Sequence, residues 1–339
     1  MYFSKKTRIS GDRDKISNCI LNWSIGDENI LNIISLPYNS SYILVKTILR
    51  YVYNNKKVLY ITEEEYNIDL ILNIKKYSKF RNYSYIRDVN MDLENNLIIC
   101  NHKKASNIKN NFHLVIYDDV NSFPKYSNEE IKQLIMKKFN KSKCIIYSIE
   151  SIFKNKMDII LPIKEDKKPI IEPRIITTRI DMNRDIPFLI YDYINFSIKF
   201  NRKVIIYVPD EIKVKNVFAY INKYPFRKEK NVYYYIKDKS NEKVITNFTK
   251  IKKAIIITNE FHYLFSYLTD TDIMVYFADD EKFNYKEFVY LCSKIKGNEG
   301  KYRGEVILLA YQETKQMEEA KIITRNFNKE AWETGLLKI

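Results

Sequence analysis

Short unbroken runs of apolar residues recur through the first half of the chain. Runs of strand length without polar alternation are typical of strands buried on both faces of a parallel sheet. The stretches between them have helical composition, so strand and helix alternate, as expected for an α/β domain. The expected strands are Ile30–Ser35, Val58–Thr62, Leu97–His102, the run from Phe112 to Asp118, and Cys144–Tyr147.

Three helices are predicted between these strands. One runs from Tyr42 to about Tyr53, and a second runs from Ile68 to about Phe80. The third opens at Ser127, which stands three residues before Glu130, the spacing of a capping box. Its apolar positions recur at helical spacing and define one buried face.

A second series of strands and helices fills the rest of the chain. The segment 161–173 contains three prolines and a charged cluster, which is typical of a linker. We therefore predict an α/β protein of two tandem domains, residues 1–160 and 174–339, each a mostly parallel sheet flanked by helices. The second domain's expected strands are Ile175–Thr178, Val204–Val208, Val232–Ile236, Ala254–Ile257, Ile273–Phe277 and Val306–Leu309, and a last helix spans Gln312 to Gly335.

The composition and the charge bear on the partner and on the cellular compartment of the protein. Lys and Arg number 57 against 42 Asp and Glu, a net charge of +15, which favours a polyanion such as nucleic acid. The abundance of Lys, Asn, Ile and Tyr, residues of AT-rich codons, is a competing explanation of that surplus. No apolar run is long enough to span a membrane, and Met1 to Asp14 lacks the apolar core of a signal peptide. We expect a cytoplasmic protein.

The cysteines predict neither a zinc site nor a redox motif. The chain has 4 cysteines, far apart and without a Cys-x-x-Cys pair. Buried free thiols in a reducing compartment are the expected state.

Glycine is scarce, which bears on phosphate binding. The chain has 6 glycines in 339 residues, where average usage would give about 24. Phosphate-binding loops use glycine because their backbone N–H groups must close around the anion without a Cβ in the way.

Two carboxylates, Asp118 and Asp119, close the apolar run that starts at Phe112, and Pro124 ends the following turn. A buried strand that ends in acidic residues is the setting of a Walker B motif, whose Asp holds Mg²⁺ on bound phosphates. A strand-end turn with solvated acids is the alternative interpretation.

The phrase from Asp118 to Pro124, Asp-Asp-Val-Asn-Ser-Phe-Pro, resembles the DEVDAFP signature of ComFA. ComFA is the helicase-like DNA-uptake ATPase of bacterial competence, in helicase superfamily 2. Further similar phrases follow in the same order, among them Pro169–Arg174, Ile205–Pro209 and Arg303–Val306. The resemblance implies two RecA-like lobes, ATP with Mg²⁺ held by Asp118, and single-stranded DNA as a partner.

The phosphate loop departs from that family pattern. The family has A-x-T-G-x-G-K-T where this chain has Ser35 to Tyr42 between a strand and a helix. The positions that would bind nucleotide are Pro37, Tyr38, Ser40, Ser41 and Tyr42, with Tyr38 and Ser40 in place of the two glycines and Ser41 in place of the lysine. We expect these bulky or uncharged side chains to prevent efficient phosphate binding.

The second phosphate clamp also departs from the pattern. Where the family has Q-x-x-G-R-x-G-R, this chain has Lys294 for the first arginine and Gly297 for the second. A lysine lacks the planar fork of an arginine. The resemblance further places DNA contacts at His102, Thr258 and Asn259, although an ordinary polar loop histidine remains an alternative for His102. The three carboxylates Glu63–Glu65 would repel a DNA backbone.

The leading hypothesis is a degenerate ComFA-like protein that binds single-stranded DNA, or proteins of the uptake machinery, with little or no ATP hydrolysis. It requires no cofactor, and ATP with Mg²⁺ at Asp118 would be expected only if the altered site still binds nucleotide. Such a protein could associate peripherally with the inner face of the membrane through its partners. An active ATP-dependent DNA translocase with an unorthodox phosphate site is one alternative. A structural adaptor that binds competence proteins and no DNA is another.

Overall fold

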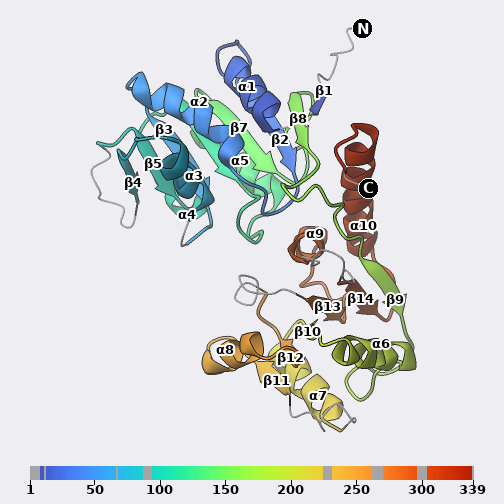
Figure 1. Cartoon of the computed structure of the whole chain (residues 1–339). Helices are drawn as coiled ribbons and strands as arrows, with labels where there is room; N and C mark the ends of the chain where they lie inside the picture. The colour runs from blue at the N-terminus through green and yellow to red at the C-terminus, as the bar shows by residue number, and fades with distance from the viewer. Residues whose placement is uncertain are drawn as a thin grey trace. The chain divides into compact units, whose positions relative to one another are not determined.

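A computed structural model describes residues 8–10, 13–65, 68–86, 94–223, 231–261, 270–295 and 304–337. The chain divides into two compact units. The first comprises residues 1–169 together with 327–339, and the second comprises residues 170–326. Each unit is built around its own parallel β-sheet (Figure 1).

The sheet of the first unit has eight strands, all parallel, in the order β1-β8-β2-β7-β6-β3-β5-β4. Crossovers between parallel strands carry helices onto the faces of the sheet. The strands are β1 (Arg8–Ser10), β2 (Ile30–Ser35), β3 (Val58–Thr62), β4 (Tyr83–Tyr85), β5 (Leu97–Cys100), β6 (Leu114–Asp118), β7 (Lys143–Ser148) and β8 (Met157–Leu161).

Helices cover both faces of this sheet because successive side chains of each buried strand point to opposite sides. In β3, Val58 and Tyr60 join the core formed with α1 (Arg13–Trp23), α2 (Tyr42–Tyr53) and α3 (Asp69–Tyr77). Leu59 and Ile61 join the opposite core, formed with α4 (His102–Ala105) and α5 (Asn128–Lys138). The unit is therefore a three-layer α/β/α sandwich.

The second unit has a six-stranded parallel sheet in the order β11-β12-β10-β13-β14-β9. One face packs on α6 and α7 around Ile206, Ile257 and Met274. Its strands are β9 (Arg174–Thr177), β10 (Lys203–Tyr207), β11 (Val232–Tyr235), β12 (Ile255–Thr258), β13 (Thr271–Tyr276) and β14 (Val306–Ala310). Its helices are α6 (Phe188–Lys199), α7 (Glu211–Ile221), α8 (Lys243–Lys250), α9 (Tyr285–Lys294) and α10 (Lys315–Glu333), whose last residues belong to the first unit.

The predicted fold class, two parallel-sheet α/β domains flanked by helices, is confirmed. The capping box is also present: Ser127 and Glu130 each accept a backbone N–H of the other. The run at Leu97 ends earlier than predicted, because His102 starts α4 and its cap residue Asn101 accepts the N–H of Lys104 at 2.9 Å.

Strand β8 is absent from the sequence prediction because Asp158 interrupts its apolar run. The structure buries that residue, since its Oδ1 accepts from Asn32 Nδ2 at 2.9 Å and from Ser151 Oγ at 3.0 Å. Strands β1 and β4, three residues each, were likewise not predicted. None of the described helices is long and apolar enough to cross a membrane.

Candidate functional site

The candidate site lies at the C-terminal ends of β2 and β6, which flank β7 in the first sheet. In parallel α/β sheets this edge is where ligands bind. The loop after β2 leads into α2, and the loop after β6 begins at Asp118 and Asp119. The sequence-predicted phosphate loop and acidic motif are thus brought together.

Asp118 is buried, and its carboxylate is surrounded by donors from its own chain. Oδ1 accepts the backbone N–H groups of Val120 at 2.8 Å and Asn121 at 3.1 Å. Oδ2 accepts the Tyr60 hydroxyl and, at 2.9 Å, Asn121 Nδ2. Burial raises the pKa of Asp118 despite these bonds. Each carboxylate oxygen of Asp118 thus already accepts two hydrogen bonds from protein donors, and these are the oxygens that would bind a metal.

Tyr38 occupies the first glycine position of the expected phosphate loop. Its φ is 57°, in the left-handed region that glycine adopts at low cost. Its backbone N–H donates to the Val120 carbonyl at 2.9 Å, which ties the loop after β2 to the loop after β6. Lys164 Nζ lies 5.9 Å from the centroid of the half-buried Tyr38 ring. Tyr38 thus has the backbone conformation that favours glycine, although it carries a large side chain.

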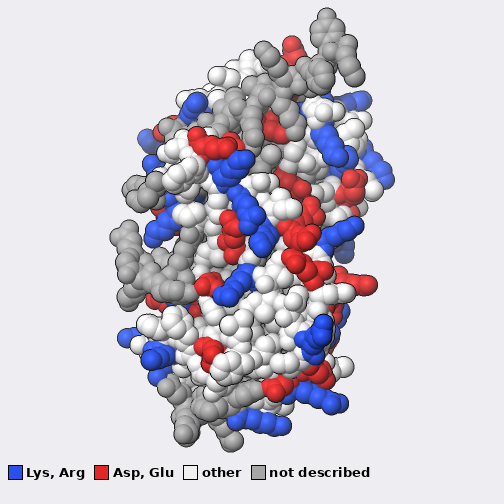
Figure 2. Space-filling model, turned by 90° about the vertical axis from the view of Figure 1, so that its right-hand side faces the viewer, with Lys and Arg blue, Asp and Glu red and all other residues white. Residues whose placement is uncertain are grey.

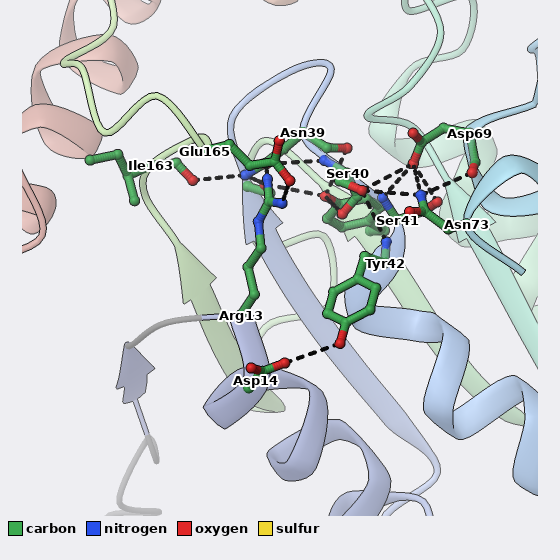
Figure 3. A network of polar contacts seen from close by, with 12 residues as sticks. Arg13, Asp14, Asn39, Ser40, Ser41, Tyr42, Asp69, Asn73, Ile163 and Glu165 are labelled. Carbon is green, nitrogen blue, oxygen red and sulfur yellow. Dashed lines mark hydrogen bonds and ion pairs between the residues drawn. The ribbon is translucent and has the colours of Figure 1, made fainter. Parts of the chain in front are cut away.

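The N–H groups of Ser40, Ser41 and Tyr42 also donate to protein atoms (Figure 3). The Ser40 N–H donates to Asn39 Oδ1 at 3.0 Å, and the Tyr42 N–H to Ser40 Oγ at 3.3 Å. The Ser41 N–H donates to Asp69 Oδ2 at 2.7 Å. These are the donors that a phosphate-binding loop directs at its ligand.

Tyr147 of β7 and residues of the segment that follows β8 also hold the loop between β2 and α2. The buried Tyr147 hydroxyl lies 3.4 Å from Ser35 Oγ and 3.3 Å from the Asn39 carbonyl. Asn39 Nδ2 donates to the Ile163 carbonyl at 3.0 Å. Arg13 pairs with Glu165 and reaches Asn39 Oδ1 at 3.3 Å (Figure 3). The loop between β2 and α2 is therefore bonded on several sides.

Glu64 is a further acidic residue near Asp118 and Asp69. Its Oε1 accepts the Asp69 N–H at 3.2 Å. Burial and the neighbouring charges of Asp118 and Asp69 raise the pKa of Glu64 to about 9, so it carries its proton at neutral pH. The protonated form limits the negative charge in the cluster. Among the described residues, no group of His, Cys, Asp and Glu has the arrangement of a metal site.

His102 lies at the end of β5, on the same edge of the sheet, and its ring packs within the protein. Nδ1 is hydrogen-bonded to the Tyr117 hydroxyl at 2.9 Å, and the ring stacks on Tyr126 with centroids 3.8 Å apart. Its backbone N–H donates to Glu63 Oε1 at 2.9 Å. Burial lowers the pKa of His102, which favours a neutral ring. Its contact with DNA stays a prediction.

A hollow of about 710 Å³ opens at the ends of β3 and β5 and is lined by Cys100 and Asn101, among others. Its walls carry both charges: Glu63–Glu65 line one part, and Lys104 and Lys125 line another. Lys125 Nζ pairs with Glu63 Oε2 at 3.3 Å. The carboxylates make this hollow a poor match for a phosphate backbone.

The predicted residues of the second unit differ in exposure. Thr258 is fully buried, and its Oγ1 accepts the Glu260 N–H at 3.0 Å. Asn259 is half-buried, and its Oδ1 has no hydrogen-bond partner among the described atoms. Lys294 is the half-buried last residue of α9, and the Gly297 position lies outside the described residues. Their roles stay predictions.

The sequence analysis did not predict that Asp69 and Tyr60 belong to the site. Asp69 is the first residue of α3, where an acidic side chain is ordinary. Tyr60 is one of several apolar positions in β3. Their partners, Ser41 and Asp118, are 28 and 58 residues away. No local pattern signals such long-range pairs.

Comparison with solved structures shows that the fold matches the tandem RecA-like domains of helicases. Xpd4 of S. tokodaii matches with a TM-score of 0.57 at 10% identity, over 96% of this chain and 98% of that one. The E. coli DExH-box NTPase HrpB matches with a TM-score of 0.52 at 10% identity, over 95% of this chain and 43% of HrpB. RecG bound to a three-way DNA junction matches with a TM-score of 0.52 at 12% identity, over 95% of this chain and 46% of RecG.

The chain thus spans less than half the length of HrpB and RecG. At these identities the likeness establishes the fold alone. No family model matches the chain, and no curated protein matches it.

Proposed function

We propose that this chain is a helicase-like protein of the ComFA type that binds single-stranded DNA and does not turn over ATP efficiently. In this proposal residues 161–173 link the two lobes. The helicase-like fold, the acidic motif at Asp118–Pro124 and the net charge of +15 support it. The absence of ATP turnover rests on the geometry of the loop after β2.

One observation carries this part of the proposal: four N–H groups of the loop donate to the chain's own atoms. Tyr38, Ser40, Ser41 and Tyr42 all donate to protein acceptors. Ser41 stands where the family lysine would reach the phosphates, and both Asp118 oxygens accept protein donors. The residues present therefore do not fit Mg²⁺-ATP. Loss of one phosphate clamp alone can slow phosphoryl transfer by on the order of 10³-fold.

DNA binding is tested by its dependence on salt. Binding of the full chain to a fluorescent single-stranded oligonucleotide should weaken steeply as salt rises, because phosphate contacts release counterions. Fluorescence anisotropy from 50 to 300 mM NaCl gives the slope. Weak binding without salt dependence would contradict the proposal.

A matched pair of histidines tests the predicted DNA contact. His102→Ala should weaken binding, on the order of threefold, if the edge at the C-terminal end of β5 faces DNA. His113→Ala is the control, because His113 is exposed at the opposite edge, just before β6. Equal affinities for both variants would remove His102 from the interface.

Two other functions each have an observation in their favour. Retention of Asp118 and Asp119 at the strand end favours an active translocase, which requires Mg²⁺-dependent ATP binding. The face drawn in Figure 2 favours an adaptor, since acidic side chains are interspersed among the basic side chains of the described residues there. An adaptor would show little affinity for oligonucleotides at any salt concentration.

A further inference from the structure

The N-terminal ends of two helices meet at one carboxylate. Asp69 is the first residue of α3, and its Oδ2 lies 2.7 Å from the backbone nitrogen of Ser41, the residue before α2. Figure 3 shows the Asp69 side chain directed at this loop. The positive ends of two helix dipoles thus converge on the same anion.

Four donors surround the Asp69 Oδ2 atom. Besides the Ser41 N–H, the Ser41 hydroxyl donates at 2.6 Å, Asn73 Nδ2 at 2.9 Å and the Ser40 hydroxyl at 3.5 Å. Asn73 Nδ2 also reaches Ser40 Oγ at 3.1 Å, so the donors are linked to each other. A cluster of N–H and hydroxyl donors at a helix N-terminus is the environment that a phosphate oxygen occupies in a phosphate-binding loop.

We propose that Asp69 is an internal ligand that occupies the place of a bound phosphate and holds the loop between β2 and α2 in the hydrogen-bonded arrangement described above. The inference deepens the proposed function and rests on the assignment of this loop as one of phosphate-binding type. The wild-type chain then needs no nucleotide to neutralise the end of α2. Removal of the carboxylate leaves donors that a small anion can satisfy.

The test is chemical rescue of stability by inorganic pyrophosphate. Thermal unfolding of the full chain is measured for wild type, Asp69→Ala and Asp69→Asn, with pyrophosphate up to 10 mM and with NaCl at matched ionic strength. Asp14→Ala is the matched control, because Asp14 accepts only the Tyr42 side-chain hydroxyl, at 3.1 Å, among the atoms of the loop and α2. Its loss leaves the loop's N–H groups unchanged.

Asp69→Ala should lower the Tm by about 5 °C, and pyrophosphate should restore roughly half of that loss in a saturable way. Asp69→Asn keeps an oxygen for the Ser41 N–H but carries no charge, so its Tm should fall less. Pyrophosphate must displace its amide, so the rescue should be smaller but still saturable. Asp69→Asn also serves as the test if the alanine variant does not fold. Wild type and Asp14→Ala should respond to pyrophosphate no more than to NaCl.

Absence of rescue in both Asp69 variants, or an equal response in wild type, would overturn the inference. A purely structural role for Asp69 predicts destabilisation without rescue. The DNA-binding assay on wild type is independent of this result. Failure of DNA binding would remove the proposed function and leave the rescue unaffected.

Discussion

Two loops of this chain differ in whether they have glycine at a position where the backbone favours it. After β2, Tyr38 stands where a phosphate-binding loop has glycine, and its φ of 57° is left-handed. Before β14, Gly304 is retained, and a Cβ there would lie 2.4 Å from the Thr271 carbonyl oxygen and 2.6 Å from Arg202 Nη2. This chain therefore has glycine where a side chain would clash with its own atoms. It lacks glycine where a phosphate would approach the backbone.

The comparison separates the needs of folding from those of ligand binding. Arg202 and Asp272 form a buried ion pair at 2.8 Å, and Asp272 Oδ1 also accepts the Glu305 N–H at 2.9 Å. Gly304 fits against this pair, so packing requires a glycine at this position. Around Tyr38, the chain's own carboxylates and amides occupy the donors that would otherwise meet a ligand.

The largest effect is expected for Gly304→Ala. The added methyl would overlap a backbone carbonyl and a buried guanidinium, which should cost about 3 kcal/mol of unfolding free energy. Gly26→Ala is the control, because a Cβ there meets only the Trp23 carbonyl oxygen at 3.6 Å. Urea unfolding that gives equal stabilities for the two variants would refute the packing role of Gly304.

Asp118→Ala should have the next largest effect. It leaves the Tyr60 hydroxyl and the N–H groups of Val120 and Asn121 without their acceptor, at a cost of about 2 kcal/mol. Asp118→Asn keeps one oxygen for those N–H groups and should cost about half as much. Unchanged stability of the alanine variant in urea would show that Asp118 is not a structural acceptor.

Glu64→Gln should change the pH dependence of stability. Because the pKa of Glu64 rises from 4.5 to about 9 on folding, the unfolded chain loses this proton first. The free energy of unfolding therefore falls as pH rises from 4.5 towards 9. Glutamine does not ionise, so the variant should exceed wild type by on the order of 1 kcal/mol at pH 8.5 and match it near pH 4.5.

The control for this measurement is Glu65→Gln, on the neighbouring exposed residue. Thermal unfolding at both pH values provides the comparison. A Glu64→Gln variant whose stability differs from wild type by the same amount at both pH values would contradict the protonated state of the half-buried Glu64.

Tyr38→Gly should have the smallest effect. Glycine removes a left-handed strain of roughly 1 kcal/mol but also removes the ring beside Lys164, so the two contributions nearly cancel. Isothermal titration should still detect no Mg²⁺-ATP binding, because Asp69 continues to occupy the Ser41 donors. ATP binding gained by this change alone would show that the tyrosine side chain was the obstacle.

The sequence predicted most strands and helices because unbroken apolar runs, as in Val58–Thr62, report burial on both faces. It also predicted the loop that contains Tyr38 and the acidic strand end at Asp118, and the structure places both at one edge of the parallel sheet. It did not predict β8, where Asp158 is buried with Asn32 as its partner. Nor did it predict that Asp69 would bond Ser41, because a helix-start aspartate does not reveal which distant loop it contacts.

The most direct measurement of the central claim is a calorimetric titration of the wild-type full chain with Mg²⁺-ATP, paired with an ATPase assay in the presence of single-stranded DNA. The account predicts no saturable binding heat and no DNA-stimulated hydrolysis. Saturable, Mg²⁺-dependent ATP binding with DNA-stimulated turnover that Asp118→Asn abolishes would contradict it.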